Sequence, residues 1–250
     1  MTSNYCIVIP HYRHVPQLER FLPRLLQANL PILVIDDGSG REVARQLATL
    51  VENHQQTELV ERDSNGGKGA ATWTGLLRAQ QQGYSHIILV DADGQHDPDD
   101  IATIHCHSRQ HPHALVSGHP QFGPDIPPAR LYGREITNIL ARIEAGNFGL
   151  KDAMCGLRVY PIKKTLRLIE ACGSRLRMET DTELLVRACW QGIEVRYIDT
   201  RVIYPEQGAS HFRMGQDNIR MALMHARLLL EAMIKLPSRH FRKLTENSTS

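Results

Sequence analysis

Strand-like segments that alternate with helical patterns constrain the fold of this chain more than any other sequence feature. Extended, largely apolar segments occur at 5–9, 32–35, 58–61 and 86–90. Between them, apolar residues recur at helical spacing over 15–28, 41–53 and 68–82. Short buried strands separated by helices predict an α/β fold, with a mostly parallel sheet covered by helices on both faces.

The second half of the chain is less regular. The segment from Pro120 to Pro128 is rich in proline and glycine, which predicts a loop. We expect helices at 129–145, 180–191 and 216–236, and an extended segment at 195–204. No repeat or obvious linker divides the chain. This organisation predicts one domain at 1–215, a helical appendage at 216–244 and a disordered polar tail at 245–250.

Charge and cysteine usage exclude several classes of protein. Lysine and arginine number 29 against 27 acidic residues, a formal charge of +2, so we expect no nucleic-acid partner. The five cysteines are widely spaced without a Cys-x-x-Cys pair, which favours free thiols in a reducing compartment. The apolar start ends too early for a signal peptide, and no segment approaches the roughly 20 apolar residues of a spanning helix. We therefore expect a cytoplasmic protein, with a role at the membrane surface left open.

The strongest functional signal is a pair of carboxylates, Asp91 and Asp93, directly after a buried strand. Two carboxylates at this spacing can share one hard cation such as Mg²⁺ or Mn²⁺. A simple acidic turn before a helix near Asp99 is the structural alternative. A calcium loop of the EF-hand type would need glycine and glutamate where His96 and Ala102 stand.

Two further turns follow predicted strands. Asp36 and Asp37 end one strand, where a carboxylate can accept hydrogen bonds from a nucleobase or a ribose. The alternative is a strand-terminating turn with Ser39 as a helix cap. The segment 65–70, Asn-Gly-Gly-Lys-Gly-Ala, places glycines before a helix, where backbone N–H groups can approach an anion. It lacks the spacing of a P-loop.

Together and in this order, these motifs resemble the family 2 glycosyltransferases, with the acidic run closest to the dolichol-phosphate mannose synthase-like branch. The segments that carry the resemblance are Val8–Tyr12, Asp36–Ser39, Asn65–Gly69, Asp91–Pro98, Asp152–Arg158 and Ser210–Arg213. The sequence departs from the family at His11 and Arg13, which replace an Asn-Glu neighbourhood, and at Leu157, which replaces an aromatic residue. The Gln-x-x-Arg-Trp signature of processive enzymes is absent.

The resemblance implies a GT-A, Rossmann-like fold with a C-terminal amphipathic helix, a nucleotide-sugar half at about 1–100 and an acceptor half at about 101–215. It implies an inverting, metal-dependent transferase that uses Mg²⁺ or Mn²⁺. The expected metal ligands are Asp91, Asp93 and Gln95. The expected nucleotide-sugar-binding residues are Pro10, Tyr12, Asp36, Lys68, Asp91, Arg158 and Arg213. His211 is a further candidate for the metal or phosphate site.

The acceptor half carries a second set of candidates. Arg130 and Arg134 lie four residues apart on a predicted helix, so both face one side. In the resembling branch, arginines here meet the phosphate of a polyprenyl-phosphate acceptor, and an ordinary solvated helix face is the alternative. Asp152 is the candidate general base or acceptor-positioning carboxylate and is assigned, with Asp93, as catalytic. A phosphate acceptor needs little base catalysis, whereas a hydroxyl needs more.

These features predict transfer of a sugar from a nucleotide-diphosphate donor to a lipid-linked acceptor at the cytoplasmic membrane face. Three alternatives stay open: a hydroxyl acceptor on a soluble or lipid glycoside, a nucleotidyltransferase, and a non-catalytic sugar-nucleotide-binding module. In the last helix, Ile219, Leu223, Ala226, Leu230 and Met233 form an apolar stripe. Basic residues accompany this stripe: Arg220, Arg227, Lys235, Arg239, Arg242 and Lys243. The stripe predicts peripheral contact with the membrane, or packing on the core or on a second subunit.

Overall fold

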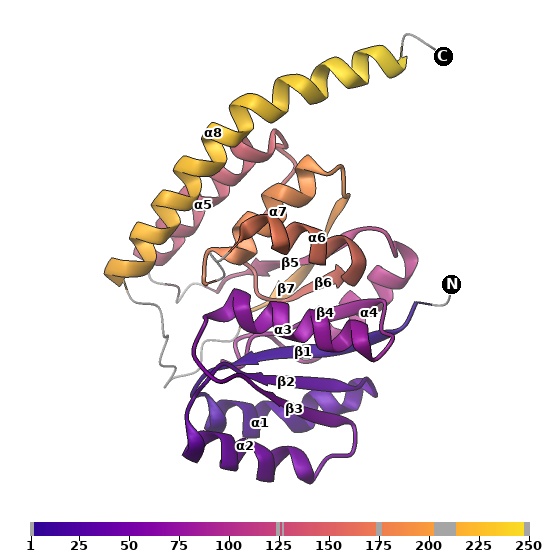
Figure 1. The fold of residues 1–250 in the computed structure, drawn as a ribbon, viewed down its shortest axis with the longest axis vertical. Coiled ribbons are helices and arrows are strands. Elements are labelled where there is room, and N and C mark those ends of the chain that lie inside the picture. The colour runs from indigo at the N-terminus through magenta and orange to yellow at the C-terminus, as the bar shows by residue number, and fades with distance from the viewer. Residues whose placement is uncertain (1–2, 124–125, 127, 174–176, 203–213, 248–250) are drawn as a thin grey trace.

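A computed structural model describes residues 3–123, 126, 128–173, 177–202 and 214–247, with the side chains of the last segment described for 215–236. Within these residues, a seven-stranded sheet has the order β3-β2-β1-β4-β6-β5-β7 (Figure 1). The strands are β1 (Tyr5–His11), β2 (Ile32–Asp36), β3 (Thr57–Glu61), β4 (His86–Leu89), β5 (Leu115–Gln121), β6 (Arg158–Pro161) and β7 (Val195–Arg201).

Helices connect most of these strands. They are α1 (Val15–Leu25), the short 3₁₀ helix η1 (Leu26–Ala28), α2 (Arg41–Glu52), α3 (Lys68–Gln81), α4 (Asp100–Gln110), α5 (Pro128–Ala145), α6 (Ile162–Cys172), α7 (Thr180–Trp190) and α8 (Met214–Asn247). The predicted mostly parallel sheet is confirmed, because β1, β2, β3 and β4 run parallel and so do β5 and β7. Only β6 is antiparallel to both of its neighbours.

β5, β6 and α6 are not among the elements predicted from the sequence, and the proline-rich loop begins later than predicted. The segment expected to be a loop from Pro120 is still strand, since β5 continues to Gln121 in register with β7. β5 pairs with β6 only at Val116 and Ser117, so Pro120 lies where β5 has a single neighbouring strand. The missing N–H of a proline is tolerated best at such a position.

Successive side chains of the central strands point to opposite faces of the sheet, so the core has two layers. Cys6 and Val8 of β1 pack into a cluster formed mainly with α3, α6 and α7. Ile7 and Ile9 face the other way, into a cluster with residues of α1, α2 and α4. All four side chains are fully buried, as expected for a strand that is covered on both faces. Figure 1 shows helices on both sides of the sheet.

The order of the parallel strands gathers the acidic turns at one edge. β1 lies between β2 and β4, and residue His11 is in register with Asp36. Val90 continues from β4 by donating its N–H to the carbonyl of Val8, and Asp91 follows. The carboxyl ends of these neighbouring strands therefore present Asp36 and Asp91 at the same side of the sheet, where α/β folds bind their ligands.

Helix α8 packs along α5 and α7 (Figure 1). Met224, Leu228 and Ala232 form its buried face. The helix runs to Asn247, past the expected end at 236 and into the segment predicted to be a disordered tail. Among the described residues, no helix combines the length and apolarity needed to cross a bilayer.

Candidate active site

Asp36 is held at the end of β2 by two neighbours. Its Oδ2 accepts the N–H of Ser39 at 3.2 Å, and its Oδ1 lies 3.4 Å from Nδ1 of His11. Burial alone would raise the pKa of Asp36, but the hydrogen bonds from His11 and Ser39 outweigh it and hold the pKa below the ordinary value. The residue is thus a buried, ionised acceptor at the edge of the site.

Asp37 fixes the glycine-rich turn, a role that the sequence analysis did not assign. Its Oδ1 accepts the N–H of Gly66 at 3.0 Å and Nε of Arg62 at 2.9 Å, and its Oδ2 accepts the N–H of Gly67 at 2.7 Å. The two backbone donors expected to approach a ligand are therefore bound by the protein itself. Gly67 has a φ of +91°, which a non-glycine residue would adopt only with strain.

Lys68 begins α3 and joins two carboxylates. Its Nζ lies 2.6 Å from Oδ1 of Asp91 and 2.6 Å from Oδ2 of Asp181, and the side chain is 12% exposed. Burial alone would lower the pKa of Lys68, but the charges of Asp181 and Asp91 raise it well above the ordinary value. Asp181 is the second residue that the sequence analysis missed, because an acidic residue at the start of a helix is typical of ordinary N-terminal turns.

Asp91 and Asp93 lie in the turn after β4, as their spacing predicted. The N–H of Gln95 donates to Oδ1 of Asp93 at 3.0 Å. Burial, and then the charge of Asp91, raise the pKa of Asp93 to about 6. Burial alone would raise the pKa of Asp91, but the charge and the hydrogen bond of Lys68 hold it below the ordinary value. The two carboxylates thus repel each other, and a cation would relieve that repulsion.

His96 stands beside this pair. Its Nε2 is 4.0 Å from Oδ2 of Asp91, and its buried Nδ1 has no hydrogen-bond partner among the described residues. Burial lowers the pKa of His96 to about 4, so the ring is neutral at neutral pH. In the sequence, His96 is distinguished only by its place in the acidic run.

The donor set fits a hard divalent cation that shares its ligands with a phosphate. The described residues contain no group of three or more histidine, cysteine and acidic side chains arranged around one point. Asp91, Asp93 and the amide oxygen of Gln95 would supply part of a coordination shell. Mg²⁺ is commonly held in this way, by one or two carboxylates with waters and substrate phosphates. Arg213 and His211, two further candidates, lie outside the described residues.

The half of the chain predicted to bind the acceptor approaches Asp91 through Gly156. A Cβ atom at this position would overlap Oδ2 of Asp91, so only glycine allows the loop to pass so close. Asp152 lies four residues earlier in the same loop. It accepts two hydrogen bonds from the Arg134 guanidinium, with Nε 2.5 Å from Oδ2 and Nη2 2.8 Å from Oδ1. The N–H of Met154 also donates to Asp152.

These contacts set the chemistry of Asp152. Burial alone would raise its pKa, but the charge and hydrogen bonds of Arg134 outweigh burial and lower the pKa. A carboxylate with a lowered pKa is a weak base, which favours a positioning role over proton abstraction. The Arg134 guanidinium carbon also lies 5.1 Å from the ring centroid of Phe122, and its Nη1 makes no hydrogen bond among the described residues.

The other predicted site residues, Pro10, Tyr12 and Arg130, lie in three different surroundings. Pro10 pairs with Ile35 inside the sheet, and Tyr12 follows β1 with the Arg13 guanidinium carbon 5.1 Å from its ring centroid. Arg130 is exposed, one turn before Arg134 on α5.

Arg158, predicted to bind the donor, lies inside the protein. The side chain is 0% exposed. Its guanidinium donates to Ser117 Oγ, to Tyr160 Oη and to the carbonyl oxygens of Ala153 and Asp181. All three guanidinium nitrogens are therefore used inside the protein, and Arg158 ties the acceptor loop to the start of α7. Four of its five N–H donors are thus used by internal partners, which favours a structural role for this buried arginine.

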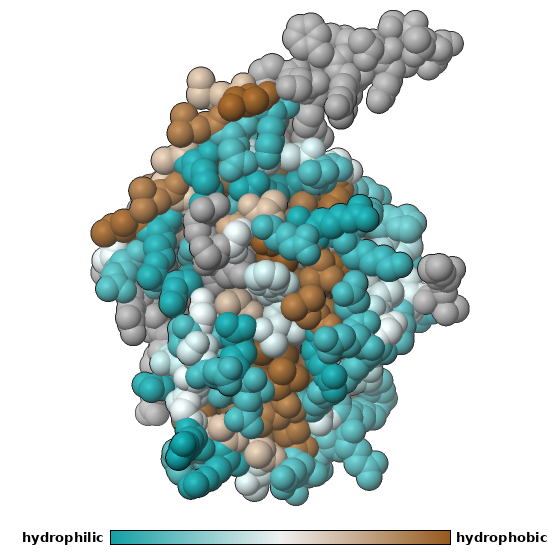
Figure 2. Space-filling model, in the orientation of Figure 1, coloured by the Kyte–Doolittle hydropathy of each residue, from teal (hydrophilic) through white to brown (hydrophobic). Residues whose placement is uncertain are grey.

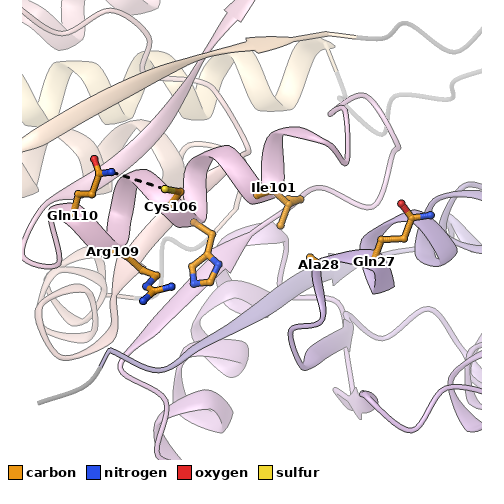
Figure 3. Close-up of a pocket in the computed structure, with 8 residues that line it drawn as sticks. Gln27, Ala28, Ile101, Cys106, Arg109 and Gln110 are labelled. Carbon is orange, nitrogen blue, oxygen red and sulfur yellow. Dashed lines mark hydrogen bonds between the residues drawn. The ribbon is translucent and has the colours of Figure 1, made fainter.

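A separate pocket lies between η1 and α4, and Figure 3 shows the side chains that line it. Gln27, Ile101, Cys106 and Arg109 are among them, and Gln110 donates to Cys106 Sγ at 3.9 Å. None of the predicted site residues lines this pocket. The predicted site therefore lies apart from this pocket.

A mostly parallel α/β sheet, with paired aspartates just beyond the carboxyl end of a central strand, is the arrangement expected of a GT-A nucleotide-sugar enzyme. The model of the family described as "Glycosyl transferase family 2" matches residues 6–162, and the chain belongs to that family. The predicted family and fold class are thereby confirmed.

Curated relatives agree with the predicted branch. The chain is 25% identical over 217 residues to the UDP-N-acetylglucosamine–dolichyl-phosphate N-acetylglucosaminyltransferase of Methanococcus voltae, covering 80% of this chain and 86% of that protein. It is 26% identical over 241 residues to the polyprenol monophosphomannose synthase of Mycolicibacterium smegmatis, covering 89% and 85%.

Solved structures share the fold at lower identity. Glucosyl-3-phosphoglycerate synthase from Mycobacterium tuberculosis, solved with Mn²⁺ and UDP, matches with a TM-score of 0.63 at 13% identity, covering 93% of this chain and 79% of that chain. A mannosyltransferase from Pyrobaculum calidifontis, solved with GDP-mannose and Mn²⁺, matches with a TM-score of 0.60 at 17% identity, covering 93% and 65%.

Proposed function

We propose that this family 2 enzyme transfers a sugar, with inversion, from a nucleotide-diphosphate sugar to a polyprenyl-phosphate-type acceptor. The donor would bind residues of the half at about 1–100 and the acceptor residues of the half at about 101–215, with 216–244 as a helical appendage. The observation that carries the proposal is the contact between Gly156 and Asp91, which brings the acceptor loop against the metal-site carboxylate. One relative named above is described as a dolichyl-phosphate N-acetylglucosaminyltransferase and the other as a polyprenol monophosphomannose synthase, which supports this acceptor class.

On the donor side, Asp36 would accept hydrogen bonds from the nucleotide base, beside Pro10 and Tyr12. Asp91, Asp93 and Gln95 would hold Mg²⁺ or Mn²⁺ against the diphosphate. When bound, the ion supplies Lewis-acid stabilisation of the charge that develops on the departing diphosphate. Lys68 pairs with Asp91 and not with Asp93, so we assign Asp93 as the principal metal ligand.

On the acceptor side, Arg134 and Arg130 would bind the phosphate. Arginine suits this task because its planar fork matches phosphate oxygens. Asp152 occupies two donors of Arg134 and fixes the direction of the guanidinium, which leaves Nη1 for the acceptor. A phosphate monoester is already an anion near neutral pH, so its attack on the sugar needs no strong base. The lowered pKa of Asp152 is consistent with that requirement.

The outer surface of α5 and α8 would face the membrane. All residues of the predicted stripe on α8 are exposed, among them Ile219 at 63% and Met233 at 74%. Figure 2 shows apolar side chains along the outer edge of α8. α5 exposes a second apolar set: Leu131, Tyr132, Ile136, Ile139 and Ile143. Exposed apolar surface of this extent is typical of a contact with lipid or protein.

The described basic residues of α8 modify this part of the prediction, while the side chains of Arg239, Arg242 and Lys243 lie outside the described ones. Arg220 pairs with Asp217, Arg227 with Glu183, and Lys235 with Glu231. Basic residues that already have acidic partners contribute little attraction to anionic lipid. We therefore propose that apolar contacts, rather than these charges, supply most of the binding at the cytoplasmic membrane face.

The test is a transfer assay with UDP- and GDP-sugars, Mn²⁺ and either undecaprenyl phosphate or dolichyl phosphate. We expect a glycosylated lipid phosphate, no product with a chelator, and no product from Asp93→Asn although that variant folds. The control acceptor is the corresponding polyprenol without its phosphate, which should stay unmodified. Transfer to the alcohol but not to the phosphate would refute the acceptor, and full activity in chelator would refute the metal.

A further inference from the structure

We infer that Lys68 is an internal counter-ion of the donor site, which occupies Asp91 before the cation arrives and couples cation binding to diphosphate binding. The inference rests on the proposed metal site at Asp91 and Asp93. It assigns functions to Lys68 and Asp181 that differ from simple contact with the donor.

The geometry defines the starting state. The Lys68 ammonium bridges Asp91 and Asp181 at 2.6 Å each. The two carboxylates come from distant parts of the chain, one after β4 and one in the first turn of α7. Asp181 is 7% exposed, and Arg158 donates to its backbone carbonyl, so the anchor of Lys68 is rigid.

A divalent cation and Lys68 therefore compete for Asp91. An ammonium within hydrogen-bond distance of this carboxylate occupies the position of a ligand, and its positive charge opposes an incoming ion. Lys68 has a flexible stem, and Asp181 keeps it in the site after Asp91 is released. The ammonium then lies beside the cation, where a diphosphate would bring negative charge.

This arrangement links the two binding events. When the cation takes Asp91, the diphosphate replaces that carboxylate as the negatively charged partner of Lys68. The cation and the diphosphate therefore strengthen each other's binding, and such coupling is reciprocal. Asp181 contributes by holding Lys68 away from full pairing with Asp91. The two residues should thus affect cation binding in opposite directions, which a merely structural salt bridge would not do.

The experiment titrates the full chain with Mn²⁺, followed by electron paramagnetic resonance, alone and with UDP or GDP. Lys68→Met, Asp181→Asn and the double variant are compared with Arg78→Met, which removes a positive charge from the same helix at its surface pair with Glu58. Circular dichroism and thermal unfolding check that each variant folds. The double variant covers the case in which Asp91 and unpaired Asp181 repel too strongly for Lys68→Met to fold.

For Mn²⁺ alone, we expect Lys68→Met to lower the Kd by about tenfold, because a competing positive charge is removed from the site. Asp181→Asn should raise the Kd, since Asp91 is then the one carboxylate among the described residues that pairs with Lys68. The double variant should bind Mn²⁺ more tightly than Asp181→Asn, and Arg78→Met should behave as wild type. In Lys68→Met, added UDP or GDP should improve Mn²⁺ binding by a smaller factor than in wild type.

An unchanged or higher Kd for Mn²⁺ in Lys68→Met would overturn the inference while leaving the metal site intact, and so would a double variant that binds no better than Asp181→Asn. If wild type binds Mn²⁺ neither alone nor with UDP or GDP, the proposed metal site falls and the inference falls with it. The two failures are therefore distinguishable.

Discussion

The Asp152 carboxylate accepts a two-pronged hydrogen bond from Arg134, whose Nε lies 2.5 Å from Oδ2 and whose Nη2 lies 2.8 Å from Oδ1. The pair joins α5 to the loop in which Gly156 lies against Asp91. The guanidinium that we propose to bind the acceptor phosphate is thus held by a carboxylate from the same half of the chain. Two donors of the guanidinium are fixed, and its orientation is set before an acceptor binds.

Arg134→Lys tests this arrangement. Lysine keeps the charge but loses the planar fork, so we expect kcat/KM for the lipid phosphate to fall about 100-fold while the KM of the nucleotide sugar changes little. Steady-state kinetics with each substrate varied in turn measure both constants. Arg142→Lys on the same helix is the control, because Arg142 bonds to Glu135 and to the carbonyl of Leu150. Equal losses for both substrates would contradict an acceptor-specific function.

Gly156→Ala tests the approach of the acceptor loop to the metal-site carboxylate. The added Cβ would overlap Oδ2 of Asp91, so the loop or the carboxylate must shift. A displacement of about 1 Å at reacting groups can cost about 100-fold in rate, and we expect a loss of that order in kcat. Gly133→Ala is the matched control, since nothing lies within 4 Å of its added Cβ. Wild-type activity in Gly156→Ala would show that the contact is not needed.

Asp36 and Asp37 should separate into a binding residue and a structural residue. Asp37 accepts three hydrogen bonds from Arg62, Gly66 and Gly67, so Asp37→Ala should lower the free energy of unfolding by about 2 kcal/mol. Asp36→Ala should mainly raise the KM of the donor, because a contact to the base is similar in ground and transition states. Denaturant unfolding and donor kinetics measure the two effects. A fall in kcat at unchanged KM for Asp36→Ala would refute its assignment.

The exposed face of α8 predicts which residues control vesicle binding. Replacing Ile219 and Leu230 together by serine should weaken binding at least about tenfold, since each large apolar side chain contributes about 2 kcal/mol when buried. Arg220→Gln should bind almost as well as wild type, because Arg220 is already paired with Asp217. Sedimentation with phosphatidylglycerol vesicles measures both. If the serine variant binds vesicles as wild type does but has a different mass in light scattering, the face is a subunit interface.

The sequence alone determined the features that depend on neighbouring residues. Apolar periodicity located β1, β2, β4 and the helices between them to within a few residues. The turns after these strands identified Asp36, Asp91 and Asp93, because parallel strands that follow one another place their ends at one edge. These inferences succeed because a strand, a helix or a turn is specified by local spacing and backbone preference.

The partners of the charged side chains were decided only by the tertiary structure. Lys68 meets Asp181, and Asp152 meets Arg134, through elements that packing brings together. The same packing buries Arg158, which the sequence assigned to the donor, and turns the apolar stripe of α8 outward. A charged or apolar residue has the same letter whether it meets solvent, a ligand or another side chain. Which of these it meets depends on segments far away in the chain, and local spacing carries no information about them.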